Sequence, residues 1–228
     1  MHGGRSDLLL NEFAIKTYPQ IPQDRLNAIK KKNPKVKRLG PNEEYEIKSS
    51  SFEVTPYLFL DRRPVDSAKY YEILGLEGFK RVWKWINKRF VTPRNKNDNN
   101  LDYYKLFIPK ASGAGHFGET LSEPVIAKPD GTSTPTFISI GKFSTLYEAE
   151  NAKKYVYTKF TRALLGILKI TQDIVPSKWK YVPLQDFTSH SDIDWSRSIP
   201  EIDQQLYRKY GLDEKEISFI ESHVKEMK

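Results

Sequence analysis

The chain has 228 residues, 38% of them apolar, and its 12 Phe, 13 Tyr and 4 Trp can fill the core of one large or two small domains. It has no cysteine, which excludes disulfide frameworks and thiolate chemistry, and no apolar run approaches the roughly 18 residues of a membrane span. No signal-peptide pattern is present, so we expect a cytoplasmic protein without membrane contact.

The excess of positive charge over negative charge lies entirely in the first part of the chain. Residues 1–100 hold 20 Lys and Arg against 12 Asp and Glu, whereas residues 101–228 hold 17 of each. A surface with this asymmetry attracts polyanions, of which nucleic acid is the commonest. The alternative is that the net positive charge, with a pI near 9.3, serves only to keep the domain soluble.

The first half of the chain predicts an arm followed by strands. Residues 1–40 are polar and basic and indicate an arm or linker. Period-two alternation predicts half-buried strands at Tyr45–Lys48 and Phe52–Thr55, and Ala68–Leu74 predicts a short helix ended by Gly75. Further strands are predicted at Tyr57–Leu60, Arg81–Val91, Tyr103–Pro109 and Thr136–Ile140.

The strand at Arg81–Val91 carries tryptophans and cations together. Alternation puts Trp83 and Trp85 on one face, and Lys84 and Ile86 on the other. In one interpretation the tryptophans face the core and the cations are ordinary solvated residues. In the other, the aromatic and basic side chains form a surface for nucleic acid, whose phosphates Lys and Arg contact. The sequence favours neither.

Helices dominate after residue 144. Thr145–Glu148 and Ser198–Glu201 match the capping box, Gly211 ends the second of these helices, and Asp213–Glu216 starts the last one. Phe160–Ile170 predicts a helix with an apolar stripe that we expect to face the core. The stripe consists of Ala163, Leu164, Ile167 and Leu168.

Strands followed by helices predict an α+β fold, with a mixed or antiparallel sheet and C-terminal helices. Asp186–Trp195, between the helices, predicts a structural loop pinned by Phe187 and Trp195. We expect an arm at 1–40, an α/β domain at 41–175, and a helical tail at 176–228 packed on that domain.

Two loops have compositions that suit nucleic acid. Gly113-x-Gly115-x-x-Gly118 matches the dinucleotide fingerprint, but prolines follow it where the fingerprint needs a helix. We therefore expect a loop whose backbone approaches a phosphate or a base edge. The Asn-rich segment 93–100 predicts a solvated loop; its amides could read adenine edges, although most Asn-rich loops are only loops.

Residues for catalysis or metal binding are not indicated. Metal-dependent nucleases need clustered carboxylates and a lysine, and Pro129–Asp130 is half of that pattern. The acid-x-Lys triplets at Glu46–Lys48 and Asp213–Lys215 are poorly placed for it, and capping or surface charge is the simpler explanation. The four histidines lack metal-ligand spacing, and no Pro-Pro dipeptide supports adenine methylation. We predict no catalytic residue, no metal and no cofactor in this chain.

The residues predicted to contact DNA are therefore basic residues around the tryptophans and small or polar residues of the glycine loop. They are Arg81, Lys84, Lys88, Arg89, Arg94, Lys96, Lys110, Ser112, Gly113, Gly115 and His116.

Several segments together resemble a known family. They are Tyr104–Gly115, Glu148–Arg162, Tyr181–Phe187, Asp194–Trp195 and Glu201–Leu212. Over roughly residues 45–228, and most strongly from Tyr147 onward, the chain resembles the C-terminal target-recognition region of bacterial restriction–modification enzymes with an adenine-specific DNA methyltransferase domain.

The resemblance implies a sequence-specific recognition domain for double-stranded DNA. It also implies that the methyltransferase domain of the same polypeptide precedes this region, binds S-adenosylmethionine and extrudes the adenine. Whether the parent enzyme also cleaves DNA stays open. Two alternatives remain from the residues: a metal-dependent DNA endonuclease domain using Asp130, and a protein-interaction module of a restriction–modification complex.

Overall fold

The computed structural model describes residues 14–15, 59–90, 100–179 and 181–227. The chain divides into two compact units. Unit 1 comprises Met1–Ile15, Tyr104–Ile126 and Ile138–Lys228, and unit 2 comprises Lys16–Tyr103 and Ala127–Phe137. The predicted strands at Tyr45–Lys48 and Phe52–Thr55 lie outside the described residues, as does most of the Asn-rich loop. The predicted boundaries at residues 40 and 175 stay predictions.

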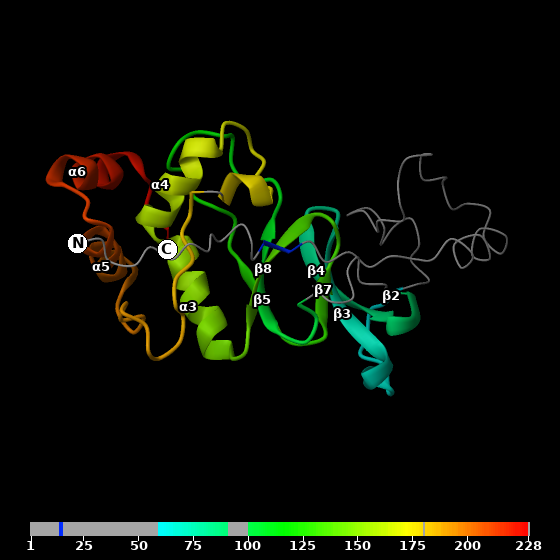
Figure 1. The fold of residues 1–228 in the computed structure, drawn as a ribbon. Coiled ribbons are helices and arrows are strands. Elements are labelled where there is room, and N and C mark those ends of the chain that lie inside the picture. The colour runs from blue at the N-terminus through cyan, green and yellow to red at the C-terminus, as the bar shows by residue number, and fades with distance from the viewer. Residues whose placement is uncertain (1–13, 16–58, 91–99, 180, 228) are drawn as a thin grey trace. The chain divides into compact units, whose positions relative to one another are not determined.

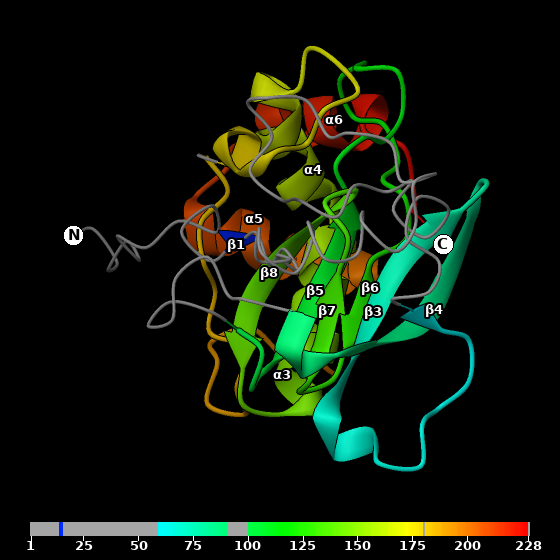
Figure 2. The same cartoon turned by 90° about the vertical axis from the view of Figure 1, so that its right-hand side faces the viewer.

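Unit 2 is built on a mixed four-stranded sheet of order β2-β4-β3-β7. β3 (Tyr70–Glu77) and β4 (Lys80–Asn87) form a long antiparallel hairpin, seen in cyan in Figure 2, and Gly78 takes the positive φ of 59° in its turn. β2 (Phe59–Leu60) pairs with β4, and β7 (Gly131–Ser133) runs parallel to β3 on the other side.

The predicted helix at Ala68–Leu74 is wrong. A 3₁₀ turn, η3 (Ser67–Lys69), leads directly into β3, which pairs with β4 along its whole length. Tyr70, Tyr71 and Ile73 favour strands, and pairing on both sides of β3 overrides the short helical pattern. Gly75, expected to end the helix, lies buried inside the strand.

Unit 1 combines a second four-stranded sheet, of order β1-β8-β5-β6, with helices. The sheet contains β1 (Ala14–Ile15), β5 (Tyr104–Pro109), β6 (Val125–Ala127) and β8 (Phe137–Phe143). β5 and β8 confirm the strands predicted at Tyr103–Pro109 and Thr136–Ile140. β1 lies in the segment predicted as an arm and pairs antiparallel with β8, with Ala14 opposite Ile140.

The helices of unit 1 begin and end largely as the sequence predicts. Ser198 and Asp213 form complete capping boxes, and Gly211 closes α5 in the left-handed conformation. Thr145 caps α3, while Glu148 accepts from the Ser144 N–H, one residue earlier than a capping box requires. The helices are α3 (Leu146–Tyr157), α4 (Lys159–Leu168), α5 (Ile199–Tyr210) and α6 (Glu214–His223).

The core of unit 1 lies between its sheet and its helices. α3 packs on β5, and α4 contacts α3, α5 and α6 (Figure 1). Trp179, in the 3₁₀ turn η5 (Pro176–Trp179), is fully buried, and Phe187 and Trp195 are buried as predicted. The Trp195 Nε1 donates to the Asp186 carbonyl at 2.9 Å, so the loop at Asp186–Trp195 is pinned as expected.

The predicted core stripe of α4 is correct only at Ala163. Leu164 and Leu168 are half-buried, and Ile167 is 54% exposed. The buried face is rotated instead toward Phe160, Thr161, Arg162 and Leu165. The stripe is real in the sequence, but part of it lies at the surface.

The two sheets and the C-terminal helices confirm the α+β class. Among the described residues, no helix has the length and apolar character that crossing a bilayer requires.

Replacing Trp195 by Phe should lower the free energy of unfolding by about 1–3 kcal/mol. The variant keeps an aromatic ring against Phe187 and Tyr155 but leaves the Asp186 carbonyl and the Ser191 hydroxyl without the indole N–H. Urea denaturation measures the change. Leu146→Ala, at a 43% exposed position of α3, is the control and should change stability by less than about 1 kcal/mol.

Candidate functional site

The pairing of β3 with β4 decides which side chains of β4 reach the surface. Ile86 is fully buried and Lys84 is 7% exposed, whereas Trp83 on the opposite face is 36% exposed and Trp85 is half-buried. The interpretation that both tryptophans are core residues is therefore wrong. Arg81 and Arg89, both exposed, stand before and after them in the chain.

Two of the cations predicted to grip DNA are already paired within unit 2. The Lys84 Nζ lies 2.7 Å from the Glu77 Oε1 and 3.1 Å from the Asp61 Oδ1. Burial lowers the pKa of Lys84, but these two carboxylates outweigh it, and the net effect is a raised pKa. The Lys88 Nζ lies 2.8 Å from the Asp130 Oδ1 and 4.7 Å from the centre of the Tyr71 ring. Their charges are largely neutralised before any ligand arrives.

A pocket of about 360 Å³ opens on unit 2 beside Trp85. The guanidinium carbon of Arg63 lies 5.8 Å from the centre of the Trp85 ring, and an Arg63 Nη donates to the Ser67 hydroxyl at 3.3 Å. Glu72, the register partner of Trp85, lies on the same face of the sheet. The lining residues are Arg63, Ser67, Ala68, Tyr70, Glu72, Trp85, Lys128, Pro129 and Asp130.

The far wall of this pocket is a tight turn. Asp130 has a φ of 63°, the only positive φ at a described residue other than glycine. Its N–H donates to the Leu101 carbonyl, and the Gly131 N–H donates to the Lys128 carbonyl at 3.0 Å. The turn thereby fixes Lys128 and Asp130 in the lining of the pocket, with Asp130 in a conformation that non-glycine residues rarely adopt.

The glycine loop of unit 1 binds an anion that belongs to the protein. The Glu119 carboxylate accepts from the N–H groups of Ala114, Gly115 and His116 at 2.9–3.2 Å, and the Lys169 Nζ lies 2.7 Å away. Burial alone would raise the pKa of Glu119, but the lysine and the three amides together lower it to about 2. A side chain at Gly113 would collide with this carboxylate. The amides expected to meet a phosphate are thus occupied by Glu119.

The remaining predicted contact residues divide between the units. Ser112 is buried and bonded to Ser122, Lys110 is half-buried, and His116 is exposed, all in unit 1. Arg81 and Arg89 belong to unit 2. Arg94 and Lys96 lie outside the described residues. Within unit 2, Arg81, Lys84, Lys88 and Arg89 all lie in or directly after β4.

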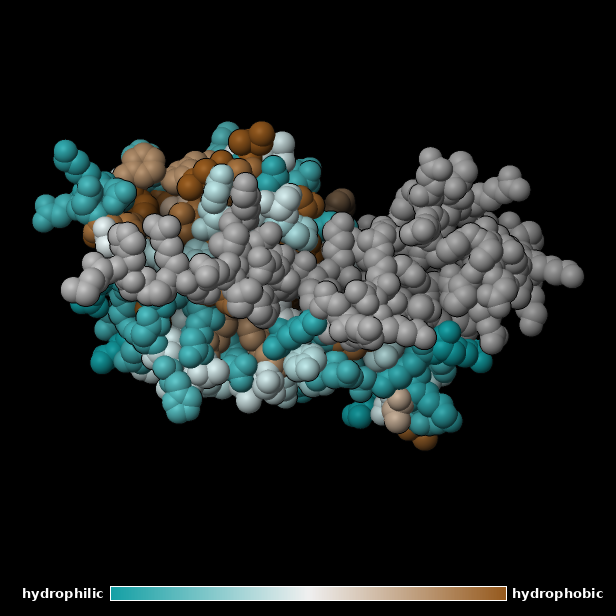
Figure 3. Space-filling view, in the orientation of Figure 1, coloured by the Kyte–Doolittle hydropathy of each residue, from teal (hydrophilic) through white to brown (hydrophobic). Residues whose placement is uncertain are grey.

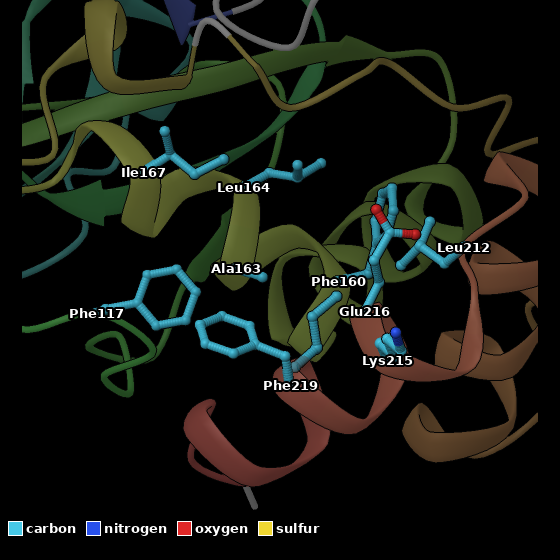
Figure 4. Close-up of a pocket in the computed structure, with 10 residues that line it drawn as sticks. Phe117, Phe160, Ala163, Leu164, Ile167, Leu212, Lys215, Glu216 and Phe219 are labelled. Carbon is cyan, nitrogen blue, oxygen red and sulfur yellow. The ribbon is translucent and has the colours of Figure 1, made fainter.

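Unit 1 also has an open apolar groove of about 470 Å³ between α4 and α6 (Figure 4). The rings of Phe117 and Phe219 lie against each other in its lining, with centres 5.6 Å apart, while Leu164 and Ile167 project from α4. Lys215 and Glu216 stand at its edge. Figure 3 shows apolar side chains gathered over α4 and α6 on this side of the unit. The groove suits apolar side chains rather than a charged ligand.

A buried ionisable group in unit 1 has a structural role. Burial raises the pKa of Asp203 to about 6, even though its carboxylate accepts from the N–H groups of Lys159 and Phe160. These two amides start α4, so Asp203 stabilises the beginning of that helix from α5. Burial lowers the pKa of its neighbour Arg162 to about 10.

The two described acids that were considered for nuclease chemistry each have another partner. Asp130 is paired with Lys88, and Asp213 caps α6. Glu46 lies outside the described residues. Within the described part of the chain, no three His, Asp or Glu residues lie close enough together to hold a metal ion.

Comparison with protein-family models and with curated proteins gives no match to this chain. The resemblance to target-recognition regions therefore stays a prediction, and the site must be judged by its own chemistry.

Sequence reasoning missed Glu119, the apolar groove and most of the pocket beside Trp85. Glu119 directly follows Gly118, so a carboxylate next to the glycine loop was the available signal. Ile167, which lines the groove, belongs to the apolar stripe of Phe160–Ile170 that the sequence predicts to face the core. Arg63, Glu72 and Lys128 are far apart in the sequence and meet only through the sheet.

Replacing Glu119 by Gln should cost up to about 3 kcal/mol of unfolding free energy at pH 7. A carboxylate whose pKa is held near 2 stabilises the fold above its ordinary pKa of 4.5, and the stabilisation is lost as the pH falls from 4.5 toward 2. The difference between variant and parent, measured by urea denaturation from pH 7 to pH 2.5, should therefore shrink on acidification. Glu150→Gln, at an exposed position of α3, is the control and should show little difference at any pH.

Proposed function

We propose that this chain is a sequence-specific recognition domain for double-stranded DNA, and that the β4 surface of unit 2 makes the contact. We define the β4 surface as Arg81, Trp83, Trp85 and Arg89. The observation that carries the proposal is the exposure of Trp83 and the partial exposure of Trp85, which stand in the chain between the exposed Arg81 and Arg89. Arginine contacts phosphates and reads guanine by two parallel hydrogen bonds, and its planar group stacks on aromatic rings.

Charge supports the same surface. Lys84 and Lys88 are paired with Asp61, Glu77 and Asp130, and the proposed contacts to the DNA backbone are assigned to Arg81 and Arg89 because these side chains are exposed. The excess of positive charge in residues 1–100 adds a long-range attraction that depends on salt. By the family resemblance, the methyltransferase domain and S-adenosylmethionine belong to the rest of the polypeptide.

The protein-interaction module is the second candidate, because the groove between α4 and α6 exposes Ile167, Phe117 and Phe219 together. An apolar groove of this kind fits the apolar face of a partner helix. Measuring duplex DNA binding at low salt distinguishes the two candidate functions, since a protein-interaction module alone has no affinity for duplex DNA.

Fluorescence anisotropy with a labelled duplex at 50–300 mM salt tests the proposal. The chain should bind with an affinity that falls steeply as salt rises. The double variant Arg81→Ala with Arg89→Ala should bind roughly tenfold more weakly at 0.1 M salt, and its log–log salt slope should be about 2 units shallower.

Arg208→Ala, at an exposed position of α5 in unit 1, is the matched control and should bind like the parent. Equal binding by the double variant and the parent would show that the β4 surface is not the contact. Absence of duplex binding by both the chain and the full polypeptide would reject DNA recognition altogether. Cleavage of the duplex on adding Mg²⁺ or Mn²⁺ would instead support the endonuclease alternative.

A further inference from the structure

We propose that the pocket beside Trp85 binds one unpaired guanine nucleotide, a proposal that deepens, and rests on, the function proposed above. The pocket of about 360 Å³ falls in the size range of small-ligand sites, and it combines an aromatic wall with groups of both charges. It lies in unit 2, next to the β4 surface that is proposed to contact DNA.

Two charged groups at this pocket have no partner within the part of the chain that the structure describes. Among the described residues, neither the Glu72 carboxylate nor the Lys128 ammonium makes a hydrogen bond or an ion pair, although both line the pocket. Asp130, the other acid of the lining, is compensated by Lys88 at 2.8 Å. The lining of the pocket therefore includes one acid and one cation that no described residue pairs with.

Glu72 selects the kind of base. An ionised carboxylate only accepts hydrogen bonds, so its ligand must present donors. Guanine alone among the four bases has two adjacent donors, the ring N1–H and the amino group at C2, and these match the two oxygens of a carboxylate. In adenine and cytosine the amino group stands beside an acceptor nitrogen, and in thymine one N–H lies between two carbonyls.

Trp85 supplies the stacking surface. Its register partner is Glu72, so a base lying on the indole directs an edge toward the carboxylate. Arg63 now covers the indole at 5.8 Å, which leaves no room for a second ring between them. Arg63 is exposed and held by one hydrogen bond to Ser67, so an arriving base displaces it, and its guanidinium joins Lys128 in contacting the phosphate.

The guanine must be unpaired. In duplex DNA its N1–H and amino group bond to cytosine, so the pocket reaches these donors only at an extruded, bulged or single-stranded nucleotide. Enzymes that read bases in pockets pay the cost of unstacking in the same way.

Isothermal titration of the whole chain with dGMP, dAMP, dCMP and dTMP tests the proposal. We expect dGMP to bind roughly tenfold or more tightly than the other three. Glu72→Gln should remove this preference, and Lys128→Ala should weaken dGMP but leave deoxyguanosine unchanged. Trp85→Phe keeps a ring in place and should retain the guanine preference with reduced affinity. Glu150→Gln, in unit 1, is the control and should bind like the parent.

Equal affinity for the four nucleotides, or no binding of any, would overturn the proposal, and salt-sensitive duplex binding by the same sample would then leave the DNA-recognition function standing. Preference for dGMP without duplex binding would keep the pocket and reject that function. A lysine-rich peptide that binds in a Glu72-dependent manner, in the absence of nucleotide binding, would assign the pocket to cations and overturn the proposal.

Discussion

The pairing of β3 with β4 is the constraint on which the candidate surface depends. Because side chains alternate along a strand, a shift of one residue would bury both tryptophans and expose Ile86. The eight register pairs from Tyr70–Asn87 to Glu77–Lys80 fix the alternation: Ile73 and Ile86 are fully buried on one face, while the other face carries Trp83 and Trp85 next to the buried Leu74. The same register places Glu72 beside Trp85. One pairing thus determines both the proposed DNA contact and the pocket.

Several charged groups of the structure are paired with opposite charges of the same unit. Sequence counting treats every Lys and Arg as available, yet Lys84, Lys88 and Lys169 each have a carboxylate within 2.8 Å. The N–H groups of the glycine loop, which could bind an anionic ligand, are likewise occupied, because they donate to the Glu119 carboxylate. A ligand must compete with these groups or contact others, so the proposals use the exposed side chains of Arg81 and Arg89, and Glu72 and Lys128 in the lining of the pocket.

The fold was more predictable from sequence than the site. Capping residues such as Ser198 and Asp213 act within one turn of their helix, so local sequence suffices to place them. The helix predicted at Ala68–Leu74 is wrong because pairing with distant strands decides the conformation of this segment. The prediction that the apolar stripe of α4 faces the core is wrong for a different reason. Periodicity shows that apolar residues share a face of a helix, but not whether another element covers that face. The pocket beside Trp85 needed residues 63, 72, 85 and 128 together, and no local pattern joins them.

Unit 2 is built from two separate segments of the chain, and this discontinuity affects how the protein folds during synthesis. β7, which completes the sheet of unit 2 beside β3, follows β5 and β6 of unit 1 along the chain. During translation the β3–β4 hairpin therefore leaves the ribosome well before its last strand exists, with one edge of β3 uncovered. Pairing of such distant segments is slow, and open strand edges favour association with other chains. The edge of β3 stays open until Gly131–Ser133 have been synthesised and have paired with it.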